Sequence, residues 1–498
     1  MSNYKLLSAN QGWLFPINVT EVLPGDTIQQ KTSALIRVAP LATPVMHPVH
    51  ARIHHFFVPN RIIWDDWEDF ITGGEYGVTP PVFPTITIPS ETNPAYGIGS
   101  LIDYMGVKPQ AVGDNAKTVS ALPIRAYQKI YNDWFRDQDV MAPAALQTTS
   151  GGDNVTSINI QQCAWGKDYF TTARPWAQKS ADVLIPAEAS LPVQGIGSVD
   201  NSYTSTNINV YESGKNTTET FANAKVVSAN TTATQIAIER DPSNTNSPWI
   251  RVNPQSAMGS INDLRLAFGL QAYAEARAIY GSRYVEYLRY LGVNSSDARL
   301  QNAEYLGGGT STIQFSEVLQ TAPSEDAPVG TMKGHGIAGM GTNRYRKFFE
   351  EHGFIISVVS VLPVPVYASA IERFWLKRTK EDFFQKELQH IGMQEITKAE
   401  LDFSGVNQAS GANFGWQLRY DEYRRQLSSV AGEFRGELAD WHMARFFEAT
   451  PSLNSDFVTA NPTTRVYSAP GEDQLYIMAH NSIQARRIIS QSGKPKVL

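Results

Sequence analysis

Four of the nine histidines lie close together in the sequence and suggest a metal site. They are His47, His50, His54 and His55. His50 and His54 would share one face of an extended strand, but at about 3.3 Å per residue they would lie roughly 13 Å apart. One ion cannot bridge that distance, so we interpret the histidines as structural and expect no metal or other cofactor.

The other candidates for catalysis also have simpler interpretations. The four carboxylates within 65–69 could serve glycoside hydrolysis, but they fall on the polar side of an amphipathic helical pattern over 62–71. The chain contains no Gly-x-Ser-x-Gly, His-Glu-x-x-His or dinucleotide-binding motif. The three glycines at 307–309 precede Thr310 rather than a phosphate-loop lysine. We interpret them as a flexible turn and the protein as a non-enzyme.

Basic residues alternate with aromatic ones at 344–347 and 373–380, and a basic pair follows at 486–487. This pattern suits single-stranded nucleic acid, because bases stack on aromatic rings while phosphates pair with cations. A solvated face or a subunit contact is the alternative. The residues that we predict to face nucleic acid are Arg344, Arg346, Lys347, Arg373, Lys377, Arg378, Arg486 and Arg487.

The chain is rich in aromatic residues, with 10 Trp and 21 Tyr. Stacking on sugars by a β-sandwich is therefore an alternative function. Most of the tryptophans, however, lie in amphipathic helical patterns such as 62–71 and 124–135, which place them in packing or at interfaces. The residues predicted to pack the subunit or its interfaces are Trp64, Trp67, Phe70, Tyr131, Trp134, Phe135 and Trp165.

Composition limits the function classes. The chain has 498 residues, 42% of them hydrophobic, and a net charge of −6. Contact with a polyanion must therefore be local or delegated to a basic partner. Cys163 is the only cysteine, which excludes an intrachain disulfide framework and favours a buried, inert thiol. The N-terminal residues lack the pattern of a secretion signal, and prolines interrupt the apolar stretch at 354–366, so we expect no membrane insertion.

The strand patterns are few and widely separated, at 28–38, 49–57, 354–367 and 475–489. No repeat or βαβ rhythm appears, so the first strands must pair with the last. This predicts a mainly β fold, a single eight-stranded antiparallel jelly roll whose very long loops carry short helices and a surface insertion. Loops of this length favour burial by neighbouring subunits.

We predict one jelly-roll domain over residues 1–498 with three appendages: an N-terminal arm at 1–20, a polar insertion at 181–260 and a basic tail at 490–498. Nearly half of 198–248 is Ser, Thr or Asn, which is too polar for a core. A long helical pattern follows at 261–291 and ends at Gly292.

An ordered set of motifs resembles the major capsid protein family of the microviruses, in particular its gokushovirus branch. The motifs are VLPGD (22–26), FFVPNRIIWDDWEDF (56–70), LPIRAYQKIYNDWFRDQ (122–138), WGKDYFTTARPWAQK (165–179), SDARLQNAEYLGGG (296–309) with SEVLQT (316–321), and GHG (334–336).

This resemblance implies a virion protein, assembled in the bacterial host cytoplasm, that self-associates into a small icosahedral shell around circular single-stranded DNA. It implies as partners a small basic DNA-associated protein, scaffolding and pilot proteins, and a bacterial surface receptor. In the gokushovirus branch an insertion forms threefold protrusions, and the block at 181–260 occupies a similar place. Its predicted receptor-facing residues are Thr204, Asn207, Tyr211, Asn216 and Thr231. A carbohydrate-binding or carbohydrate-cleaving sandwich and a host-surface adhesin are the alternatives.

Overall fold

A computed structural model describes most of the chain and divides it into two compact units, Met1–Lys179 with Glu275–Leu498, and Ser180–Ala274. The described residues are 1–74, 80–89, 93–109, 111, 114–181, 183, 261–281, 283–297, 299, 301–319, 321, 332–403, 412–449 and 451–489, with short strands between 193 and 252.

The first unit is organised around a long antiparallel sheet. Along the chain, its eight main strands are β1 (Ser2–Ala9), β2 (Phe15–Val22), β3 (Thr27–Val38), β4 (Val49–Pro59), β15 (Glu304–Leu319), β16 (Met332–Gly341), β18 (Gly353–Pro363) and β21 (Leu475–Arg486). The sheet order is β1-β21-β3-β16-β15-β4-β18-β2, and β17 (Tyr345–Phe348) also pairs with β3. Two four-stranded halves with this order form a jelly roll, which confirms the predicted mainly β fold.

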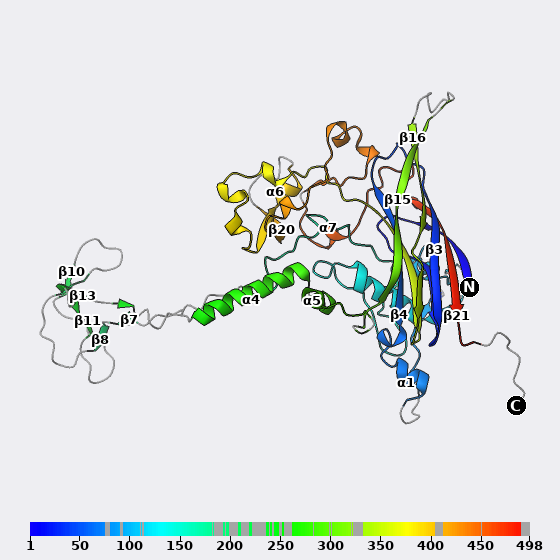
Figure 1. The fold of residues 1–498 in the computed structure, drawn as a ribbon, viewed down its shortest axis with the longest axis horizontal. Coiled ribbons are helices and arrows are strands. Elements are labelled where there is room, and N and C mark those ends of the chain that lie inside the picture. The colour runs from blue at the N-terminus through cyan, green and yellow to red at the C-terminus, as the bar shows by residue number, and fades with distance from the viewer. Residues whose placement is uncertain are drawn as a thin grey trace, which may run out of the picture. The chain divides into compact units, whose positions relative to one another are not determined.

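The last strand lies between the first and the third, as the scarcity of hairpin patterns predicted (Figure 1). The prediction of an arm at 1–20 is wrong, because β1 and most of β2 lie in this segment. β1 is an edge strand that is held by backbone pairing to β21 and is exposed along most of its length, so it needs no alternation of apolar residues. The predicted tail at 490–498 lies outside the described residues.

The interpretation of the three glycines at 307–309 as a flexible turn is also wrong, since they lie within β15 and pair with β4. A Cβ on Gly308 would lie 2.4 Å from the Ile53 carbonyl oxygen, and one on Gly309 would lie 2.7 Å from the Gly341 carbonyl oxygen. Gly307 adopts a φ of 139°, next to a shift in register. The glycines therefore allow close backbone contact between β15, β4 and the end of β16.

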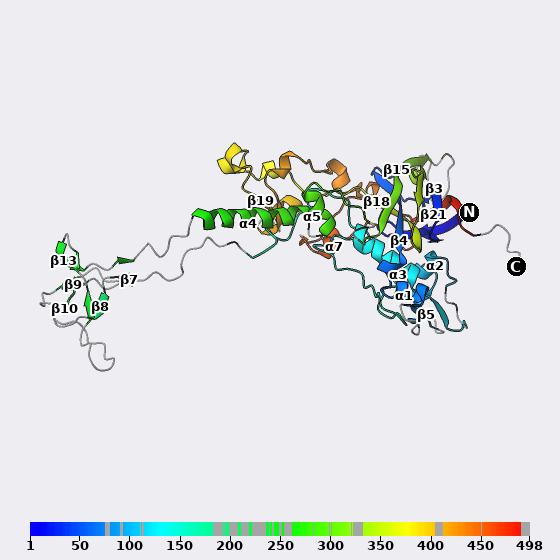
Figure 2. The ribbon, with the colours of Figure 1, turned by 60° about the horizontal axis from the view of Figure 1, so that its bottom comes forward.

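The core lies inside the roll and on one of its outer sides. Every second residue of β3, from Ile28 to Val38, is buried. Outside the roll, helix α3 (Leu122–Ile130) contributes to an apolar cluster with residues of β4 and β18 (Figure 2). The long excursion between β4 and β15 therefore covers one half of the sheet, while the half that contains β21 stays open.

The predicted helix over 62–71 is shorter than expected. A 3₁₀ turn at Asn60–Ile62 precedes helix α1, which spans Trp67–Thr72 and ends at Gly73 with a φ of 86°. The predicted helix over 124–135 is present as α3, followed by a π-helical turn at Tyr131–Phe135.

The long helical pattern at 261–291 forms two helices, α4 (Ile261–Tyr280) and α5 (Tyr284–Tyr290). Gly281 separates them, with a φ of 95° that a residue with a side chain rarely adopts. The apolar spacing predicted the helical segments but not this break.

The remaining short elements lie in the loops. In the first unit they are β5 (Thr85–Ile88), α2 (Leu101–Tyr104), β6 (Lys117–Ser120), β19 (Met393–Thr397), α6 (Lys398–Leu401), β20 (Asn413–Leu418) and α7 (Ser455–Val458). In the second they are β7 (Val193–Gln194), β8 (Ile196–Ser198), β9 (Ile208–Val210), β10 (Glu219–Phe221), β11 (Ile236–Ile238), β12 (Arg240–Asp241), β13 (Asn244–Pro248) and β14 (Arg251–Val252). No helix within the described part of the chain is long and apolar enough to span a membrane.

A buried ion pair anchors the excursion that follows β4. Arg125 on α3 donates to Asp153 at 2.7 Å, and both side chains are fully buried. Arg125 also donates to the carbonyl oxygens of Ile63 and Thr149. Burial raises the pKa of the Asp153 carboxyl, but hydrogen bonds from Thr156 and Arg125 outweigh this effect and hold it below its usual value. One guanidinium thus joins α3 to two loops.

We expect Asp153→Asn to destabilise the unassembled chain by about 3–5 kcal/mol, because it leaves the Arg125 charge buried without its counter-ion. Urea unfolding would measure the change. Glu351→Gln is the matched control, since it breaks the partly exposed Arg61–Glu351 pair and should cost about 1 kcal/mol or less. Equal losses in both variants would contradict the anchoring role.

Candidate nucleic-acid and subunit interfaces

The predicted interface aromatics pack largely within the chain. Trp64 is fully buried, and its indole N–H donates to the Ser150 hydroxyl at 2.8 Å. Its ring centroid lies 4.8 Å from that of Phe70 and 5.8 Å from that of Trp67. This cluster fastens α1 to the turn that precedes it.

A second aromatic cluster lies against the outer face of β4. The Trp134 and Phe135 rings lie 5.6 and 5.8 Å from Phe56. Tyr131 and Trp165 are buried, with exposed fractions of 4% and 3%. These side chains therefore pack within the chain and support the outer face of β4. A subunit contact through the half-buried ones stays a prediction.

Four of the eight cations predicted to face nucleic acid have acidic partners in the same chain. Lys377 is only 8% exposed and also donates to the Tyr423 hydroxyl at 2.7 Å. A cation that is neutralised in this way offers little to a phosphate. The pairs are Lys347–Glu304, Arg373–Glu400 (3.0 Å), Lys377–Glu422 (3.6 Å) and Arg487–Asp26 (3.1 Å).

The other four predicted cations are exposed, but they do not form one site. Arg346 lies on β17, Arg486 ends β21, and Arg344 lies in the turn that precedes β17. Arg378 lies in another part of the chain, where its guanidinium donates to two nearby backbone carbonyls. The structure therefore brings together Arg344, Arg346 and Arg486 and separates them from Arg378.

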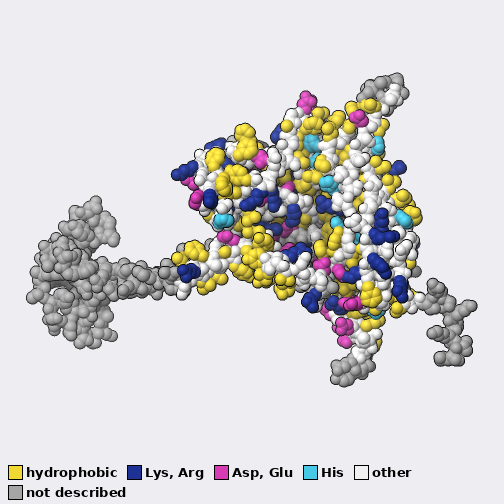
Figure 3. Space-filling model, viewed as in Figure 1, with side chains coloured by type: hydrophobic (Ala, Val, Ile, Leu, Met, Phe, Trp, Pro, Cys, Tyr) yellow, Lys and Arg dark blue, Asp and Glu magenta, His cyan; other side chains and the backbone are white. Residues whose placement is uncertain are grey.

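The strands β1, β21, β3, β16 and β17 contain no Asp or Glu, and we call their exposed side the acid-free face. Figure 3 shows Lys and Arg side chains among hydrophobic ones over β3 and β21. Tyr476 lies opposite Arg37, and Tyr4 stacks on His480 with ring centroids 4.4 Å apart. The exposed cations of the face are Lys31, Arg37, Lys333, Arg346 and Arg486, and none of them has an acidic partner among the described residues.

Sequence analysis missed Lys31, Arg37 and Lys333 as members of this surface. Each is isolated in the sequence, so no cluster of basic residues marks it. The signal was present in the alternation of β3, which places Lys31 and Arg37 on the polar side of the strand. Pairing of β3 with β16 and β21 then gathers single cations from distant segments.

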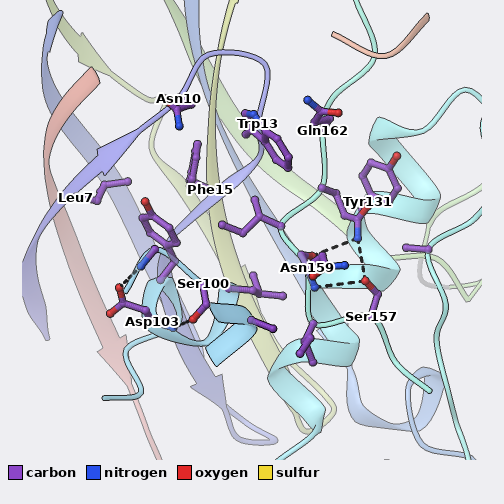
Figure 4. Close-up of a pocket in the computed structure, with 18 of the residues that line it drawn as sticks. Leu7, Asn10, Trp13, Phe15, Ser100, Asp103, Tyr131, Ser157, Asn159 and Gln162 are labelled. Carbon is purple, nitrogen blue, oxygen red and sulfur yellow. Dashed lines mark hydrogen bonds between the residues drawn. The ribbon is translucent and has the colours of Figure 1, made fainter. Parts of the chain in front are cut away.

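A large open cleft, of about 1030 Å³, lies beside β1. Figure 4 shows Leu7, Phe15 and Trp13 on one side and Ser157 and Asn159 on the other. Its lining mixes apolar and amide side chains. This composition suits packing against another chain better than catalysis.

The four histidines are tied to hydrogen-bond partners rather than to one another. His55 is fully buried between the Ser357 and Thr342 hydroxyls, at 2.7 and 3.2 Å, and burial lowers its pKa to about 4. His54 lies 3.3 Å from the Tyr305 hydroxyl. Within the described part of the chain, no three His, Cys, Asp or Glu side chains gather as a metal site.

Two further predictions concern reactivity and sugar binding. Cys163 is buried, as predicted, and burial raises its pKa to about 12, which disfavours the reactive thiolate. Among the described tryptophans, only Trp176 and Trp375 are at least 36% exposed, and they lie far apart in the sequence. The described residues therefore offer no broad tryptophan platform for a sugar.

The predicted receptor-facing residues lie outside the described residues. They are Thr204, Asn207, Tyr211, Asn216 and Thr231.

Comparison with known proteins gives consistent matches along almost the whole chain. Residues 1–495 match a family model described as capsid protein (F protein). The chain is 35% identical to capsid protein VP1 of Bdellovibrio phage phiMH2K, with 90% of this chain and 85% of the relative covered. It is 30% identical to capsid protein VP1 of Chlamydia phage 1 (92% and 88% covered) and 32% identical to that of Spiroplasma virus 4 (90% and 85% covered).

Proposed function

Because the chain belongs to the capsid protein (F protein) family of the microviruses, and is therefore a structural virion protein rather than an enzyme, we propose that its copies close into a small icosahedral shell around circular single-stranded DNA. Symmetric self-association needs only surfaces that fit one another, and no catalytic group. The long excursions of this jelly roll would provide much of that surface, since loops of such length are seldom left unpacked.

The acid-free face carries the DNA-binding part of the proposal. Five strands gather exposed cations with no acidic residue among them, although the whole chain has a net charge of −6. Exposed Tyr4, Tyr476 and Phe348 lie on the same strands. Aromatic rings beside cations allow bases to stack while phosphates are neutralised, without selecting a sequence. This face would line the inside of the shell.

We expect the double variant Lys31→Gln, Arg37→Gln to weaken the salt dependence of DNA binding. For single strands the slope of log K against log salt is about 0.7 per neutralised phosphate, so the variant should lower its magnitude by about 1.4. Titration of the unassembled chain with an oligothymidylate over a salt series would measure it. Arg378→Gln, outside the face, should leave the slope unchanged, and the opposite ranking would contradict the proposal.

The proposal includes partners whose chemistry complements this chain. The acidic net charge fits a shell whose genome is further neutralised by a small basic viral protein. Scaffolding and pilot proteins would assist assembly in the cytoplasm of the bacterial host. The open cleft beside β1 is a candidate surface for one of these proteins.

The second compact unit, Ser180–Ala274, would form the outer protrusion at the threefold axes and contribute to recognition of a bacterial surface receptor. Its boundaries are close to those of the polar block predicted at 181–260. A polar Thr- and Asn-rich composition suits a solvated surface whose sequence can vary without affecting the core.

Deletion of 198–248 should leave shell formation intact and lower adsorption to host cells at least tenfold. The strands of the jelly roll lie outside the deleted segment, so the core should fold as before. Sedimentation of the particles and counting of unadsorbed virus would measure the two effects. Normal adsorption of the deleted particles would exclude the receptor role.

A further inference from the structure

Exposed aromatic rings concentrate in one lobe of the first unit, between residues 373 and 425. Five aromatic side chains there are more than half exposed, which is half of all such side chains among the described residues. We call these five the aromatic patch. They are Phe374 (57%), Trp375 (66%), Phe383 (54%), Phe384 (53%) and Tyr423 (55%). Figure 3 shows hydrophobic side chains interspersed with Lys and Arg over this lobe, at the upper left.

The patch is held together by contacts between its members and one nearly buried cation. The Phe374 and Trp375 ring centroids lie 5.2 Å apart, and Phe384 lies 6.4 Å from Tyr423. The Lys377 ammonium lies 4.2 Å from the Tyr423 ring centroid and 5.6 Å from that of Phe383. Phe383, Phe384 and Tyr423 thus gather around Lys377, while Phe374 and Trp375 contact each other just before that lysine in the chain.

Internal ion pairs fix the segment that presents Phe374 and Trp375. Arg373, directly before them, pairs with Glu400 at 3.0 Å and donates to the Glu395 carbonyl oxygen at 2.7 Å. Lys377, two residues after them, is anchored to Glu422. The segment that presents the two rings is thus fixed by ion pairs on both sides, which lowers the entropic cost of ordering its backbone on binding.

This exposure of aromatic side chains is unfavourable for an isolated chain. More than half of the surface of each of these aromatic side chains stays in contact with water in the folded chain. Clusters of this kind are typical of the buried centres of protein interfaces. Nucleic acid is a weaker candidate partner, because Arg373 and Lys377 are already committed to carboxylates. In Figures 1 and 2 the lobe that contains β20 and α6 also lies away from β21 and the acid-free face.

We propose that the aromatic patch is an assembly contact that docks onto a neighbouring copy of this chain in the shell. The proposal rests on the proposed function, since a capsid protein meets its own copies at fixed positions and every exposed patch recurs on each. Trp375 and the three Phe rings would form the desolvated centre of the contact, and exposed Arg378 and Lys380 would lie on its rim.

The test compares assembly of Trp375→Ser and Phe384→Ser chains with that of the wild type. Each substitution should raise the concentration needed for shell formation by about thirtyfold, because loss of a central ring is costly at an interface. Thermal unfolding of the unassembled chains should be unchanged, since both side chains are exposed. Trp375→Phe should restore much of the assembly. Tyr284→Ser is the matched control, because Tyr284 is an exposed aromatic residue on α5, outside both the patch and the acid-free face.

Assembly of both serine variants at the wild-type concentration would overturn the proposal. Normal assembly with weakened oligothymidylate binding would assign the patch to nucleic acid instead. If the wild-type chain forms no shell, the proposed function fails separately. The patch is then tested by self-association of the free chain, measured by sedimentation equilibrium, and an unchanged association constant in Trp375→Ser would exclude it.

Discussion

The pairing of the last strand between the first and the third is the constraint on which the rest of the molecule depends. β21 forms a twelve-residue ladder with β3 and an eight-residue one with β1. The long loops between β3 and β21 must therefore leave the roll and return to it between its strands. The excursion after β4 covers the outer side of β4 and β18, where the buried Arg125–Asp153 pair fixes it. The opposite half is left uncovered and free of acidic residues.

A shell protein needs one surface for DNA and another for neighbouring copies, and this chain keeps the two proposed surfaces apart. The acid-free face offers cations and aromatic rings in a regular strand array, which suits a flexible polyanion. The aromatic patch offers aromatic rings next to a segment that internal ion pairs fix, which suits a protein surface of fixed shape. The patch lies in a lobe away from the acid-free face and shares no residue with it, so binding to DNA and contact between copies do not compete for the same residues (Figure 1).

The sequence predicted the fold better than the surfaces. β3 alternates clearly because only one side of it is buried, and the distance between the strand patterns required first-to-last pairing. β15 was missed because its glycines resemble a turn, although close backbone contact with Ile53 and Gly341 requires them. The clusters of basic residues did not predict which cations are free to bind DNA. Their ion-pair partners are distant in the sequence, as Asp26 is from Arg487. Conversely, the acid-free face is assembled from single cations that only strand pairing brings together.

Sedimentation of the purified chain, with electron microscopy of any fast fraction, tests the central claim most directly. The account predicts closed shells of uniform size, formed by the chain alone or after addition of its scaffolding partners. A chain that stays monomeric at high concentration, even with those partners present, would contradict it.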